Sequence, residues 1–143
     1  SKGGILAMID IENIVFTAVS NAVKAEYPKA AIYGDYVEAP ADFPCVCISE
    51  DDNYSYGLTQ DNALEDNNVG VMYSVNIFTS NQVGKKTEAK KIAKIVDSVL
   101  LGFKMSRTAL LPVPNADTTI YRITGRYTAV IGRYGDGNYQ MYR

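Results

Sequence analysis

The sequence has 143 residues, which suits a single domain, and we expect one α+β domain over residues 1–143. Hydrophobic residues make up 47% and charged residues 21%, which excludes disorder as the main state. The formal net charge of −2 and the lack of a clustered basic surface argue against nucleic acid recognition. No apolar run approaches the ~20 residues that span a bilayer, and the start lacks the apolar region of a secretory signal. We therefore expect a cytosolic chain with no membrane partner.

The first predicted element is a helix over about Asp10 to Glu26. Asp10 is a candidate N-cap, Glu12 falls in the first turn, and Pro28 ends the helix. Apolar residues at spacings of three and four predict one buried stripe, made of Ile11, Ile14, Val15, Ala18, Val19, Ala22 and Val23.

Three β-like runs follow, at residues 31–37, 43–50 and 69–78. The second has apolar residues on both faces and predicts a central strand, whereas the third alternates with a period of two. Between them, residues 51–68 are rich in Asp, Glu and Asn and predict a long polar loop. A loop of this length is uncommon in a compact domain unless it is functional.

A second helix is predicted over about Lys85 to Leu101, with Gly102 as its C-terminal stop. Its lysines are interpreted as a solvated face: Lys85, Lys86, Lys90, Lys91 and Lys94. Strands are then predicted over Lys104 to Leu111 and over Thr118 to about Gly132, and Asp136-Gly137 between β-prone flanks predicts a tight hairpin.

Two amphipathic helices each need an apolar surface, and one face of a sheet supplies it. The predicted fold class is therefore α+β, with a mostly antiparallel sheet and the two helices packed on one face.

The residues that usually carry chemistry are few. Histidine is absent, which removes the commonest general base. Cys45 and Cys47 point to the same face of a strand and are predicted to be buried packing residues, because a disulfide between them would be badly strained. We therefore predict no catalytic, cofactor-binding or metal-ligating residues. One alternative stays open, a small enzyme that uses carboxylates between Asp51 and Asp66.

The chain has 11 tyrosines and no tryptophan, and several tyrosines fall in predicted loop or terminal segments. Tyrosine is enriched at protein interfaces. As a hypothesis, the interface residues are Tyr54, Tyr56, Leu58, Tyr134, Tyr139 and Tyr142.

The order, spacing and local residue patterns of these segments resemble the tail-terminator (tail-completion) proteins of long-tailed bacteriophages and phage-tail-like particles. The matching segments, which cover nearly the whole chain without a diagnostic motif, are Met8-Ile9-Asp10-Ile11, residues 36–44, the acidic loop, residues 71–78, the lysine-rich helix and residues 126–132.

This resemblance implies a homohexameric ring that caps the tail tube, ends tube polymerisation and joins the tail to the head-side connector. The implied partners are other copies of the chain, the tail tube protein, a head–tail connector or neck protein and the tail sheath. The implied location is the virion, at the tail–head junction, after assembly in the cytoplasm of the host bacterium. A neck or head–tail connector protein stays open as an alternative.

Overall fold

The computed structural model describes residues 12–37, 40–55, 68–80, 84–115, 117–133 and 139–142. It contains two helices, α1 (Glu12–Glu26) and α2 (Lys85–Gly102). The strands are β1 (Ala31–Tyr33), β2 (Cys45–Ser55), β3 (Asn68–Thr79), β4 (Ser106–Val113), β5 (Tyr121–Arg133) and β6 (Tyr139–Tyr142).

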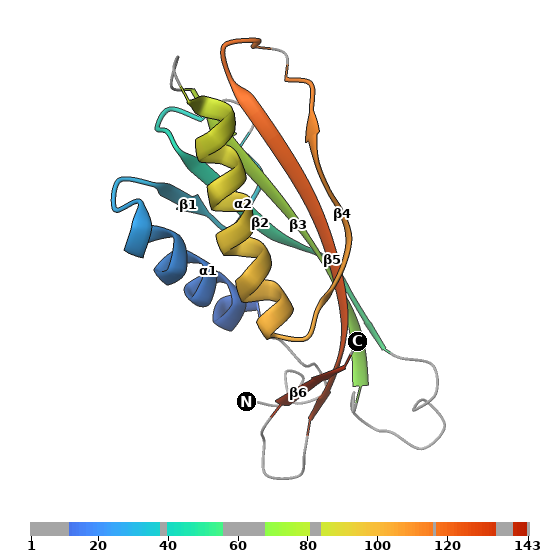
Figure 1. Ribbon diagram of the computed structural model, residues 1–143. Coiled ribbons are helices and arrows are strands. Elements are labelled where there is room, and N and C mark those ends of the chain that lie inside the picture. The colour runs from blue at the N-terminus through green and yellow to red at the C-terminus, as the bar shows by residue number, and fades with distance from the viewer. Residues whose placement is uncertain are drawn as a thin grey trace.

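The strands form one sheet in the order β1-β2-β3-β5-β4, and β6 pairs with β5 beyond the start of β4. Only the β1–β2 pair is parallel among the pairs that the structure describes. Both helices lie over the same face of this sheet (Figure 1). The predicted α+β fold, with a mostly antiparallel sheet and helices on one face, is confirmed.

The main core fills the space between the helices and the sheet. Val15, Val19 and Val23 form a fully buried stripe on α1 at a spacing of four residues. On α2 the buried residues are Ala89, Ile92, Ala93, Val96 and Leu100, whereas Val99, and Phe103 just after the helix, are half-buried. The sheet contributes Tyr73, Ile77, Ile123 and Tyr127 to the same core, so the inner face of the sheet is covered by both helices.

The predicted stripe of α1 was too wide. Ile14 lies on α1 with 50% of its surface exposed, and Ala18 and Ala22 are only half-buried. One helix face can contact the sheet and α2 at the same time, and seven apolar positions span more of the helix circumference than that contact covers. Asp10 and Ile11 lie outside the described residues.

Strand β2 extends into the stretch that was predicted to be the acidic loop. Residues 51–55, expected in the loop, continue β2. After an irregularity between Glu50 and Asp52, residues 52–55 pair with residues 69–72 of β3. The polar side chains at this point have partners on β3, because the Tyr73 hydroxyl donates to Glu50 at 2.7 Å and the Ser74 hydroxyl donates to Asp51. These cross-strand bonds offset the low strand propensity of the acidic residues.

The end of α2 also differs from the prediction. Gly102 is still helical, and the residue in the left-handed region is Lys104, with φ of 65°. The N–H of Met105 donates to the carbonyl of Leu100 at 3.1 Å, and the Met105 side chain is fully buried. The burial of Met105 accompanies this helix end, as apolar contacts commonly do.

Other strand bounds shift by a few residues. β1 ends at Tyr33 rather than at residue 37, and β4 runs from Ser106 to Val113, two residues past the predicted end at Leu111, so that it includes Pro112. An edge strand tolerates this proline because one side of its backbone has no partner strand. β5 and β6 pair antiparallel as predicted, whereas the Asp136-Gly137 turn lies outside the described residues.

Candidate assembly surface

Two of the predicted interface residues, Tyr54 of β2 and Tyr142 of β6, lie at the same end of the sheet. Tyr54 of β2 is opposite Gly70 of β3, Gly70 is opposite Val130 of β5, and Val130 is opposite Tyr142 of β6. These four backbone positions form one row across four strands, at the end where β6 lies (Figure 1). Positions that are 88 residues apart in the sequence are therefore separated by only two strands.

The remaining predicted interface residues are placed less fully. Tyr139 lies in β6 opposite Arg133. Tyr56, Leu58 and Tyr134 lie outside the described residues, and for Tyr54, Tyr139 and Tyr142 the structure gives the backbone position. Their role in an interface stays a prediction.

A groove between α2 and β4 was not predicted. It has a volume of about 430 Å³ and opens between the exposed side of α2 and the edge strand; we call it the α2–β4 groove. Its lining residues are Lys90, Ala93, Lys94, Asp97, Arg107, Leu110, Leu111, Pro112 and Ile123. The sequence carries only a partial signal, because the lysines match a solvated face and the apolar residues match an ordinary strand.

The charge of Asp97 at this groove is already compensated. Arg107 donates to Asp97 Oδ2 at 2.8 Å, and the Tyr127 hydroxyl donates to Asp97 Oδ1 at 2.7 Å. Burial, followed by the bond to Asp97, raises the pKa of Tyr127 above its ordinary value. Lys90 and Lys94 are exposed and form no ion pair with another described residue. The groove therefore combines an apolar floor with an uncompensated positive rim.

The opposite face of the sheet, which we call the outer face, carries a second cluster around Arg122. Its Nε and Nη2 atoms donate to Asn76 Oδ1 at 3.0 and 2.9 Å, and the Thr124 hydroxyl donates to the same oxygen at 2.8 Å. The guanidinium carbon lies 5.3 Å from the ring centre of Tyr36 and 5.8 Å from that of Phe78. These contacts hold the segment after β1 against the sheet.

Cys45 and Cys47 lie in the same outer-face cluster, and the prediction that both are buried is confirmed. Their sulfur atoms are 4.0 Å apart and are not bonded as a disulfide. The hydrogen bond with Cys47, together with burial, raises the pKa of Cys45. The hydrogen bond with Cys45 lowers the pKa of Cys47, helped by the Val37 N–H and by Arg122 and opposed by burial. Both thiols are closed off from solvent and serve as packing groups.

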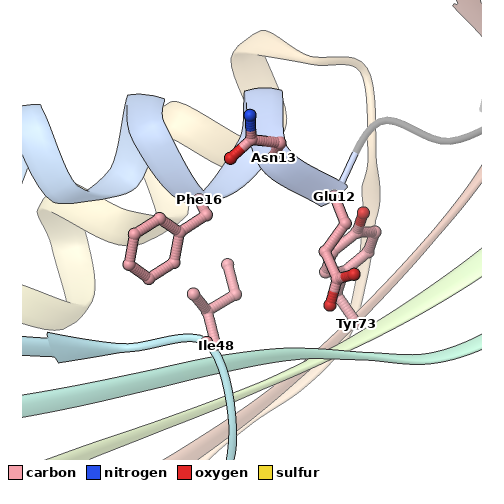
Figure 2. Close-up of a pocket in the computed structure, with 6 residues that line it drawn as sticks. Glu12, Asn13, Phe16, Ile48 and Tyr73 are labelled. Carbon is pink, nitrogen blue, oxygen red and sulfur yellow. The ribbon is translucent and has the colours of Figure 1, made fainter.

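A smaller cavity of about 270 Å³ lies beneath the first turns of α1, lined by Glu12, Asn13, Phe16, Gly34, Ile48 and Tyr73. Figure 2 shows the Phe16 ring facing Ile48, with the Glu12 carboxylate beside the Tyr73 ring. The Tyr73 hydroxyl is engaged with Glu50. The cavity is mainly apolar, which suits packing more than it suits chemistry.

We also searched for metal-ligating groups, for membrane-spanning helices and for related proteins. Among the described residues, no group of three or more Cys, Asp or Glu side chains is arranged to hold a metal ion. The helices that the structure describes are too short or too polar to span a bilayer. Comparison with protein-family models and with curated proteins found no match to this chain.

Proposed function

We propose that this chain is a tail-terminator protein, a structural virion protein that forms a homohexameric ring on the tail tube of a long-tailed bacteriophage. The ring ends polymerisation of the tube and joins the tail to the head-side connector or neck protein. Its partners are other copies of the chain, the tail tube protein, the connector and, in a contractile tail, the sheath. The chain acts in the virion, at the tail–head junction, after assembly in the bacterial cytoplasm.

The observation that carries the proposal is the row of Tyr54, Gly70, Val130 and Tyr142 across four strands. It supports an assembly role because two separate tyrosine-bearing segments share one end of the sheet. The α2–β4 groove lies elsewhere, between the exposed side of α2 and the edge strand. Two different patches on one subunit are what a closed ring with head-to-tail contacts requires.

The carboxylate-dependent enzyme has less support. Glu50 and Asp51, at the start of the acidic stretch, accept hydrogen bonds from Tyr73 and Ser74 across the β2–β3 pair. These carboxylates therefore have a structural role, because they help to hold β2 against β3.

The test removes the chain from the phage that encodes it and examines the particles by electron microscopy. A terminator predicts tail tubes that exceed their normal length and carry no heads. Tails of normal length that lack heads would instead assign the chain to the neck or connector. Normal, infectious particles would contradict both assignments.

A further inference from the structure

We propose that the α2–β4 groove binds the acidic segment at residues 56–67 of a second copy of this chain. The inference rests on the proposed ring, and it names the contact that would join neighbouring subunits.

The groove has the features of a docking surface for a short apolar segment. Ala93 and Ile123 form a buried floor, with 5% and 4% of their surfaces exposed. Leu110 is half-buried beside them, and Pro112, which is opposite Ile123 on β5, is exposed. Gly125 opposite Leu110 lets that leucine pack closely, since a Cβ atom at Gly125 would lie 2.9 Å from Leu110 Cδ1. A partner with apolar side chains would cover this surface.

The rim determines the charge of the occupant. Lys90 and Lys94 are one helical turn apart on α2 and line the same side of the groove. Asp97 is neutralised by Arg107, so it does not offset them. An occupant with apolar residues next to carboxylates would match both floor and rim.

Residues 56–67 have this composition. The segment reads Tyr-Gly-Leu-Thr-Gln-Asp-Asn-Ala-Leu-Glu-Asp-Asn and contains no lysine or arginine. Its apolar residues include Leu58 and Leu64, and its carboxylates are Asp61, Glu65 and Asp66. Of the segments between described elements, it is the one that places leucines next to several acidic residues.

The sheet order favours a second copy over the same chain. The segment leaves the sheet at Ser55 and returns at Asn68, on the β3 side of β5. The groove lies on the other side of β5, next to β4, and β6 occupies that edge of β5 at the level where the segment leaves. A contact between copies would use two different patches and can repeat around a closed ring.

The test reverses charges on each side of the contact, in particles made with the variant as the only source of this chain. The groove variant is Lys90→Glu with Lys94→Glu, and the segment variant is Asp61→Lys with Glu65→Lys. A fourfold variant combines both. The control, Lys24→Glu with Lys91→Glu, makes the same charge change at exposed helix positions that do not line the groove.

Each charge reversal should lower the copies of the chain per particle by about tenfold or more, and the fourfold variant should recover most of that loss. The control should match the natural chain, and all variants should keep its melting temperature. A photo-crosslinking residue at Asn62, in rings mixed from isotopically labelled and unlabelled subunits, should crosslink to α2 or β4 of a different copy.

A groove variant that assembles normally, or crosslinks confined to one chain, would overturn this inference and leave the proposed function standing. If the natural chain is itself absent from the tail end, the proposed function fails, and this inference fails with it.

Discussion

Tyr127 of β5 is fully buried, and its hydroxyl donates a 2.7 Å hydrogen bond to the Asp97 carboxylate on α2. The bond joins a strand next to the sheet edge to the helix that covers it, and Arg107 of β4 binds the other oxygen of the same carboxylate. One carboxylate therefore connects three elements around the α2–β4 groove.

Replacing Tyr127 with phenylalanine should lower the free energy of unfolding by about 1–3 kcal/mol, because a buried hydrogen bond to a charged group is lost. Urea unfolding would measure the change. The matched control is Tyr121→Phe on the same strand, because the Tyr121 hydroxyl has no hydrogen bond to another described residue. Equal effects from the two changes would show that the bond to Asp97 contributes nothing.

The same tyrosine predicts how stability responds to alkaline pH. Burial and Asp97 raise the pKa of Tyr127, so above about pH 10 the unfolded chain loses its phenolic proton while the folded chain keeps it. The contribution is complete below the unfolded pKa and is lost as the pH rises towards the folded pKa. The free energy of unfolding should fall more steeply between pH 9.5 and 11 in the natural chain than in the Tyr127→Phe variant, by roughly one extra proton released on unfolding. Parallel curves would contradict the raised pKa.

Arg122→Lys tests the outer-face cluster. Lysine cannot donate from two nitrogens to Asn76 Oδ1 while lying over Tyr36 and Phe78, so the free energy of unfolding should fall by about 1–2 kcal/mol. Arg126→Lys is the control, because Arg126 is exposed on the same strand and should change stability by less than about 0.5 kcal/mol. A neutral Arg122→Lys would mean that the guanidinium geometry is not needed.

The parts of the fold that follow from local pattern could be predicted from the sequence. The buried stripe of α2 follows from its apolar spacing, and the inward positions of β5 at Ile123, Tyr127 and Ala129 follow from alternation. Both patterns depend only on residues within one element.

Features that depend on distant partners could not be predicted in this way. β2 continues past Glu50 because Tyr73 and Ser74, more than twenty positions away, bind its carboxylates. Lys104 adopts the left-handed conformation where Met105 becomes buried, and the groove exists because β4 lies beside α2. Each of these features needs the tertiary arrangement, which composition and spacing do not carry.

The extended β2 also defines how the acidic segment should be removed. Replacing residues 56–67 with an Asn-Gly turn keeps the paired positions Ser55 and Val69. A longer deletion that started at residue 53 would also remove the last paired residues of β2. The shortened chain should unfold at a denaturant concentration close to that of the natural chain and should fail to enter tails. A Gly/Ser linker of equal length is the control for spacing and should also fail. Normal tail termination by either variant would place the interface elsewhere, with β6 and its preceding turn as the next candidate.

The most direct test of the assembly role is the copy number and position of this chain in purified particles, measured by cryo-electron microscopy with native mass spectrometry of the released ring. The account predicts six copies in one closed ring at the head-proximal end of the tail tube. A chain that is monomeric both free and in the particle, or that lies away from the end of the tube, would contradict it.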